Sequence, residues 1–136
     1  ISDQAQKNPG NKLYPYYLGI AYSTIGESAK AEEAYLSALK IDPNFADAST
    51  NIGGIILNKG INLFNQANQL PQNQQKEYEA MIKLGEAELE KALPFLIKSS
   101  ELDPKSRIAL ENLKTYYIIK KNQDKVTEIS AKLEKL

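Results

Sequence analysis

The chain has 136 residues, which is enough for one domain. It carries 17 basic and 17 acidic side chains, so no overall field attracts it to nucleic acid or to an anionic membrane. It contains no Cys, which excludes disulfides and thiolate metal sites, and no His, the commonest general base and metal ligand. We therefore predict a non-catalytic protein without cofactors or bound metal.

Three prolines, each preceded by Asn or Asp, divide the chain: Asn8-Pro9, Asp42-Pro43 and Asp103-Pro104. The first two prolines are 34 residues apart, and the last two are 61 apart, which exceeds the first spacing by 27. Proline cannot continue a helix and disfavours helical geometry in the residue before it. Each pair therefore predicts a helix end followed by a new start.

Apolar residues at helical spacing predict six helices after a remnant and a Pro-Gly turn at residues 1–11. The expected spans are 12–25, 28–41, 46 to a turn at 70–73, about 74–102, 107–120 and 123–135. Gly26 is expected to form the first turn with a positive φ, and Pro94 to bend the long fourth helix or to open one of its hydrogen bonds. Glu32 and Glu33 near the start of their helix suit its dipole.

The first two helices carry a recurring set of small and aromatic positions. They are Leu18, Gly19, Tyr22, Gly26, Ala31, Tyr35, Ala38 and Pro43. This pattern resembles the tetratricopeptide repeat (TPR), with Pro15 where that family usually has tryptophan. The resemblance implies an all-α, right-handed α-α superhelix in which each repeat packs on the next.

Two further units follow the same pattern. The second has Ile52, Gly53, Ile56, Gly60, Ala92, Leu96, Ser99 and Pro104 in the corresponding places. The third is more degenerate, with Leu113, Tyr117 and Val126 in place but Lys114 and Lys121 where the glycines would stand. The expected domains are the tail of a preceding repeat at 1–11, then TPR 1 at 12–45, TPR 2 at 46–106 and a capping TPR 3 at 107–136.

The 27 extra residues lie in the second unit, where the apolar spacing continues past Gly60 and predicts an extended helical hairpin at about 60–90. Divided between two arms and a turn, the insertion lengthens each helix by about 12 residues, or about 18 Å. A hairpin protruding in this way resembles bacterial TPR proteins, which are often exported. Because Pro9 is in register with Pro43, we expect a C-terminal fragment of a longer repeat protein, exported or cytoplasmic.

Two groups of charged residues could carry other functions. Glu86 and Glu90 share a helix face and could hold a hard cation, although pairing with Lys83 and Lys91 is the simpler interpretation. The stretch 114–121 mixes Lys114, Lys120 and Lys121 with Tyr116 and Tyr117, as nucleic-acid sites do, but nearby acids cancel its charge. We predict no nucleic-acid partner and no membrane insertion, because the apolar runs are too short to span a bilayer.

A protein or peptide partner is the function that remains, because the first helices of successive TPRs line a concave face. The resemblance places on that face Leu13, Tyr16, Ile20, Asp47, Thr50, Asn51, Ile108, Glu111, Asn112 and Thr115. The basic clamp that some members use for a peptide carboxylate is absent, so chaperone tails are not expected. A mixed apolar and amide groove could take an extended peptide or a helix. Alternatively, Tyr16 and Tyr17 only pack against an upstream repeat.

The hairpin tip is a second candidate contact, formed by Gln69, Leu70, Gln72 and Asn73. Its amides could bind a partner, or they could serve solubility alone. The alternative function is a structural module in which the upstream face and the hairpin mediate self-association.

Overall fold

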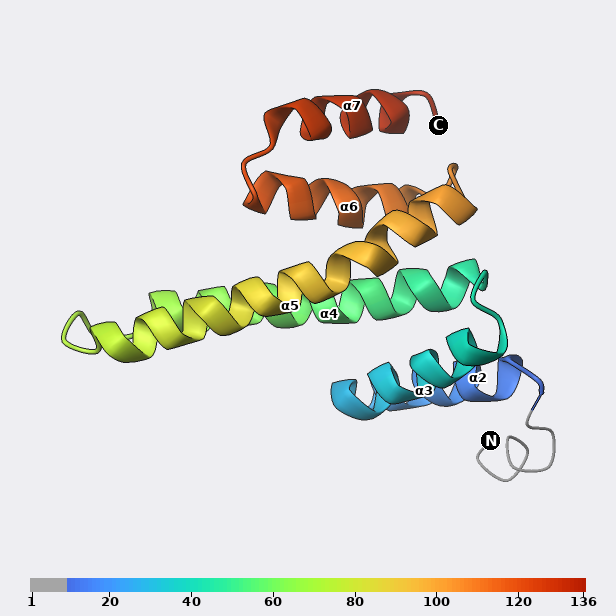
Figure 1. The fold of residues 1–136 in the computed structure, drawn as a ribbon, viewed down its shortest axis with the longest axis horizontal. Helices are drawn as coiled ribbons and strands as arrows, with labels where there is room; N and C mark the ends of the chain where they lie inside the picture. The colour runs from blue at the N-terminus through green and yellow to red at the C-terminus, as the bar shows by residue number, and fades with distance from the viewer. Residues whose placement is uncertain (1–9) are drawn as a thin grey trace.

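The computed structural model describes residues 10–136, which form six helices packed in pairs (Figure 1). The expected tail of a preceding repeat, at residues 1–11, lies outside this range except for its last two residues. The helices are α2 (Leu13–Thr24), α3 (Ser28–Ile41), α4 (Ala46–Asn68), α5 (Gln75–Leu102), α6 (Arg107–Ile119) and α7 (Gln123–Glu134). These bounds confirm the spans predicted from apolar periodicity to within one residue.

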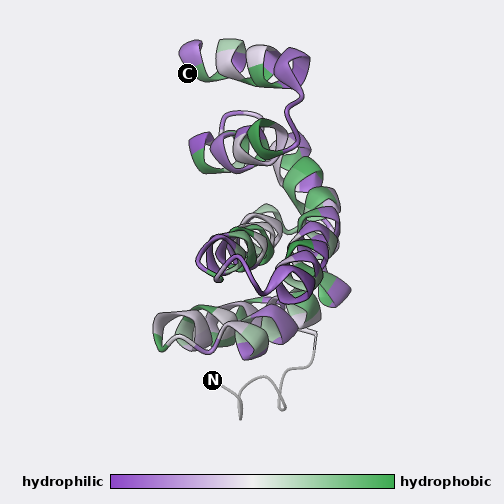
Figure 2. Cartoon of the chain, turned by 90° about the vertical axis from the view of Figure 1, so that its left-hand side faces the viewer, coloured by the Kyte–Doolittle hydropathy of each residue, from purple (hydrophilic) through white to green (hydrophobic). Residues whose placement is uncertain are grey.

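Each helix packs on its neighbour in the chain. Helix α2 packs on α3, α4 on α5 and α6 on α7, while α3–α4 and α5–α6 contacts join one pair to the next. Figure 2 shows the three pairs stacked from the N-terminal to the C-terminal end. A single pair buries only one side, so stacking supplies the continuous core.

Glycines set the distances between helices in two of the pairs. A β-carbon on Gly19 of α2 would lie 2.6 Å from the Tyr35 ring, and one on Gly85 of α5 would lie 2.7 Å from the Phe64 ring. In the same hairpin, a β-carbon on Gly60 would lie 3.1 Å from the carbonyl oxygen of Gly85. Only residues without side chains allow such close approach, so these positions determine how the pairs pack.

The turns of the first and last pairs share one backbone feature. Gly26 ends the α2–α3 turn with φ of 81°, which confirms its predicted role. Lys121, which the repeat pattern aligns with it, has φ of 59° in the α6–α7 turn. A side chain strains this left-handed conformation, whereas glycine adopts it freely.

Helices α4 and α5, with 23 and 28 residues, are the longest, and the loop joining them lies at the far left of Figure 1. The Asn- and Gln-rich stretch after Gly60 is helical as far as Asn68. Helix α5 runs unbroken through Pro94, and its last turns diverge from α4 toward α6 in Figure 1. Figure 2 shows the end of the hairpin as hydrophilic.

Glu32 has a different role from the one expected from its position in α3. It lies beyond the first helical turn and is 7% exposed. Its Oε1 lies 2.5 Å from Lys91 Nζ on α5, and its Oε2 lies 3.5 Å from Lys59 Nζ on α4. Burying a carboxylate is costly without such partners, so Glu32 connects three helices across two pairs instead of complementing a dipole.

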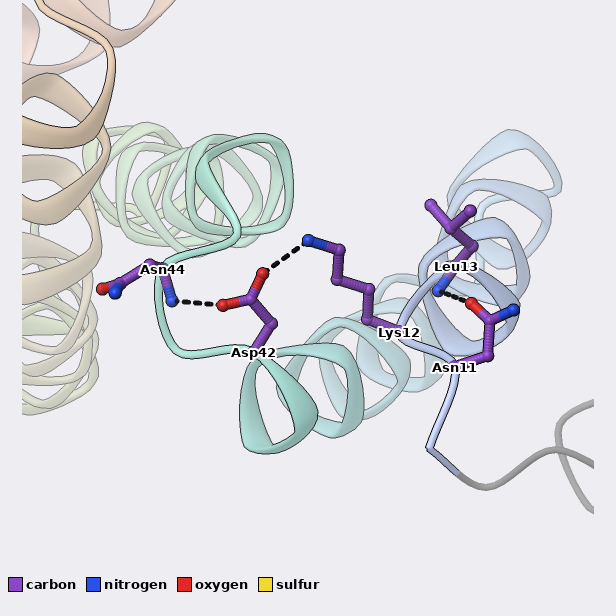
Figure 3. Close-up of polar contacts among 5 residues, drawn as sticks. All are labelled: Asn11, Lys12, Leu13, Asp42 and Asn44. Carbon is purple, nitrogen blue, oxygen red and sulfur yellow. Dashed lines mark hydrogen bonds and ion pairs between the residues drawn. The ribbon is translucent and has the colours of Figure 1, made fainter.

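A second ion pair joins the start of α2 to the end of α3 (Figure 3). The Lys12 ammonium lies 2.5 Å from Asp42 Oδ2, while the backbone N–H of Asn44 donates to Asp42 Oδ1 at 3.0 Å. Lys12 also lies 4.5 Å from the centre of the Phe45 ring. Hydrogen bonding to Lys12 and then to Asn44 lowers the pKa of the Asp42 carboxyl. These contacts hold the turn from which α4 begins.

Candidate functional site: a groove between the first helices

A groove of about 450 Å³ runs between α2, α4 and α6, the first helices of the three pairs. Its lining combines branched apolar side chains with amides and hydroxyls. The lining residues are Ile20, Ser23, Thr24, Tyr35, Thr50, Asn51, Gly54, Ile55, Asn58, Ile108 and Asn112. Of the residues that the structure describes, these eleven line the groove and none of them is charged.

Hydroxyl groups at the groove are turned toward their own helices. Thr24 donates to the Ile20 carbonyl at 2.8 Å, and Thr50 donates to the Ala46 carbonyl at 3.0 Å. Each hydroxyl proton is therefore used, while the oxygen keeps a lone pair that can accept from a ligand N–H. The groove thus offers hydrogen-bond acceptors at fixed positions.

Amide side chains supply both donors and acceptors. Asn51 Nδ2 donates to the Tyr35 hydroxyl at 3.4 Å, which holds this amide against α3. Across the groove, the Asn112 Nδ2 atom would lie 3.4 Å from a β-carbon on Gly54. Because Gly54 has no side chain, the Asn112 amide reaches over the backbone of α4. Asn58 lies one turn further along α4 and is exposed.

Tyr16 lies behind the groove in an aromatic cluster. Its ring centre is 4.8 Å from that of Phe45 and 5.9 Å from that of Tyr35. Burial, followed by the nearby Asp47 carboxylate, raises the pKa of the Tyr16 hydroxyl. Burial is also the main cause of the raised pKa of Tyr35. Both tyrosines therefore stay neutral at physiological pH and act as packing and hydrogen-bonding groups.

The groove brings together half of the residues expected on the concave face. These are Ile20, Thr50, Asn51, Ile108 and Asn112. The other five lie outside its lining. Leu13 lines a separate hollow beside Ile41, Tyr16 is partly buried in the aromatic cluster, and Asp47 is exposed in the first turn of α4. Exposed Glu111 lies 3.9 Å from Arg107, and the Thr115 hydroxyl donates to the Glu111 carbonyl.

The groove also contains residues that the sequence analysis did not select. Ser23 and Thr24 continue the α2 stripe from Ile20, and Ile55 and Asn58 continue the α4 stripe from Asn51 and Gly54. Helical spacing of three or four residues could have found all four. Tyr35 could not be found in this way, because it belongs to a second helix and its ring reaches the groove past Gly19.

The hairpin tip lacks a groove of this kind among the described residues. Gln69, Gln72 and Asn73 are exposed and Leu70 is partly buried, in a loop closed by a hydrogen bond from the Gln74 N–H to the Pro71 carbonyl. The polar side chains are available to a partner, but they form no described pocket.

Residues of the two charged groups considered above, Glu86–Glu90 and 114–121, contact one another or other helices. Tyr116 is 4% exposed and donates from its hydroxyl to Glu90 Oε1 at 2.9 Å, while Lys120 lies 3.1 Å from the same oxygen. Tyr116, rather than Tyr117, is therefore the tyrosine most buried in this unit. Lys91 pairs with Glu32, not with the Glu86–Glu90 stripe.

No group of three or more acidic side chains in residues 10–136 is placed to hold a metal ion. No helix in that range is long and apolar enough to cross a membrane.

Comparisons with known proteins give only distant similarity. No family model matches the chain, and neither does any curated protein. Among solved structures, the chain is similar to MamA (residues 41 to the end) from Desulfovibrio magneticus RS-1, with 20% identity, 97% of this chain and 78% of that chain covered, and a TM-score of 0.40. A MamA RS-1 ArsTM double mutant gives 20% identity, coverage of 96% and 78%, and a TM-score of 0.40.

Proposed function

We propose that this chain is a non-catalytic scaffold of the TPR type that holds an extended segment of a partner protein in the groove between α2, α4 and α6. Its helix pairs would form three repeats, at residues 12–45, 46–106 and 107–136, in a right-handed superhelix. The middle repeat would extend into a protruding hairpin. The repeated positions in the sequence and the pairing of the helices support this proposal.

One observation carries the choice of ligand. The groove has amides at Asn51, Asn58 and Asn112 and isoleucines at three positions, and its lining includes no charged side chain. Side-chain amides can pair with both the N–H and the C=O of a peptide backbone, and apolar walls accept alternate side chains. Such a lining suits an extended, uncharged peptide better than an anionic ligand.

The proposal is tested by affinity capture from lysate of the source cells, with the wild-type chain and groove variants as baits. Thr50→Arg places a long charged side chain in the groove, and Asn112→Ala removes one amide. Both should weaken capture of the same partner. Thr50→Arg should reduce affinity about tenfold or more because it fills the groove, and Asn112→Ala should reduce it about two- to tenfold because one hydrogen bond is lost. A tip variant, Gln72→Lys with Asn73→Lys, is the matched surface control and should keep the partner.

The control also decides between the groove and the tip. Loss of the partner with the tip variant alone would move the site to the hairpin and contradict the groove. A partner retained by all variants would contradict both sites.

Self-association is the second candidate function, because apolar side chains are exposed on the first helix pair. Leu13 is 40% exposed, Tyr17 49% and Leu36 38%. Light scattering over a range of concentrations tests this candidate, since a mass of one chain throughout would contradict it. Tyr17→Ser should weaken any assembly that forms through this face.

A further inference from the structure

A second hollow lies outside the groove, between the C-terminal part of α5 and α7. It has a volume of about 780 Å³, and its lining extends from Ser100 in α5 through the loop at Pro104 to Leu136. Leu110 and Leu113 of α6 and Ile129 of α7 form its apolar floor. We name it the α5–α7 cleft.

The packing of the helices explains why this cleft is open. Helices α5 and α7 both pack on α6 without forming a close interface with each other. The corresponding gap between α3 and α5 is bridged by the ion pair of Glu32 with Lys91. In residues 10–136, no ion pair links α5 to α7 in this way, so the cleft stays open above a floor whose side chains are largely buried: Leu110 is 2% exposed, Leu113 8% and Ile129 3%.

The charges around the cleft are predominantly positive. Lys105, Lys132 and Lys135 line it together with one acid, Glu101. Lys132 lies 3.6 Å from Glu128, whereas Lys105 and Lys135 make no ion pair with any described residue. A complementary ligand would carry an apolar stripe flanked by negative charge.

We propose that the α5–α7 cleft binds an acidic amphipathic helix of a partner protein. Its apolar side chains would rest on Leu110, Leu113 and Ile129, and its carboxylates would face Lys105 and Lys135. The two flanking helices and the floor helix already present the elongated surface on which a further helix packs, ridges against grooves. This site is independent of the groove in the proposed function.

The test is a selection against the full chain from a displayed library of helical peptides. All members have apolar residues every three or four positions, with acidic, basic or neutral residues between them. The expected result is enrichment of acidic members. A synthetic copy of the most enriched peptide is then titrated against variants of the chain by fluorescence anisotropy.

Charge reversal at the rim should weaken this peptide. Lys105→Glu with Lys135→Glu should reduce affinity about tenfold or more, and the loss should shrink at high salt. Leu136→Ser, at a residue 47% exposed, should reduce it several-fold without affecting folding. The matched control, Lys76→Glu with Lys83→Glu, makes the same charge change at exposed positions near the other end of α5 and should leave affinity unchanged.

Several results would overturn the proposal. Enrichment of basic or neutral peptides, no enrichment, or a peptide insensitive to the rim variant would each exclude an acidic helix at this cleft. The proposal would also be excluded if Thr50→Arg weakened peptide binding and the rim variant did not, because binding would then lie in the groove. If the cleft bound laurate, a fatty-acid anion, while the library gave no enriched peptide, the cleft would be a site for an acyl anion and not for a helix. Self-association that Leu136→Ser abolishes would identify a second copy of the chain.

Discussion

The ring of Tyr35 occupies the space in which a β-carbon on Gly19 would stand. That carbon would lie 2.6 Å from Cε1 and 2.7 Å from Cδ1 of a tyrosine that is 2% exposed. Helices α2 and α3 therefore meet through a glycine and an aromatic ring. The same contact lets Tyr35 reach the groove, where its hydroxyl accepts from Asn51.

Gly19→Ala should therefore destabilise the protein although alanine favours helix. Overpacking a buried contact costs about 1–3 kcal/mol, and alanine's helical advantage offsets about 1 kcal/mol of this, so we expect a net loss of up to about 2 kcal/mol. Urea unfolding measures it. The control is Gly54→Ala, whose nearest neighbour is the Asn112 amide at 3.4 Å. It should gain about 0.5–1 kcal/mol, and equal effects at both sites would contradict this account.

The buried carboxylate of Glu32 should contribute measurably to the stacking of the first two pairs. Its partners Lys59 and Lys91 are partly exposed, which reduces the cost of losing it, so Glu32→Gln should lower the free energy of unfolding by about 1–2 kcal/mol. Its exposed neighbour provides the control, since Glu33→Gln should change stability by less than about 0.5 kcal/mol. A double-mutant cycle with Lys91→Met that gives no coupling energy would refute the pair's contribution.

Tyr116 should make stability fall at high pH. Burial, followed by its hydrogen bond to Glu90, raises its pKa from 10.0 to about 12. The unfolded chain therefore releases this proton near pH 10 while the folded chain keeps it, so the free energy of unfolding decreases from about pH 10 to about pH 12. Tyrosinate absorbance should show a last step near pH 12 that is missing in Tyr116→Phe. Glu90→Gln should bring that step to lower pH.

Two carboxylates should make the free energy of unfolding decrease as the pH falls into the acid range. Lys12 lowers the pKa of Asp42, and Lys120 followed by Tyr116 lowers that of Glu90. A depressed folded pKa stabilises the protein above the unfolded pKa, which is about 4, and this contribution is lost as pH falls through the folded value. Asp42→Asn and Glu90→Gln should each flatten the acid limb of unfolding free energy against pH. An unchanged limb in both variants would contradict these assignments.

Replacing Lys121 with glycine should stabilise the protein. Its φ of 59° strains a residue with a side chain, so Lys121→Gly should raise the free energy of unfolding by about 1 kcal/mol. Lys121→Ala removes the charge but keeps the β-carbon, so it should change stability little. If alanine stabilises the chain as much as glycine does, the lysine charge and not the backbone is the cause.

The sequence alone determined the helices and their order, because apolar periodicity and proline positions depend only on neighbours along the chain. It determined the turn at Gly26 and the helical course of the chain past Gly60. The resemblance to the repeat family selected Ile20, Thr50 and Asn51, which line the groove.

Only the tertiary structure decided which side chains from different helices meet. It buried Glu32 in an ion pair with Lys91 instead of leaving it in solvent, and it buried Tyr116 against Glu90. It also left Asp47 and Glu111 out of the groove lining. It also left open the cleft between α5 and α7. Periodicity identifies the buried face of a helix, but the partner of each residue depends on helix spacing and rotation, which glycine contacts such as Gly19 with Tyr35 set across the chain.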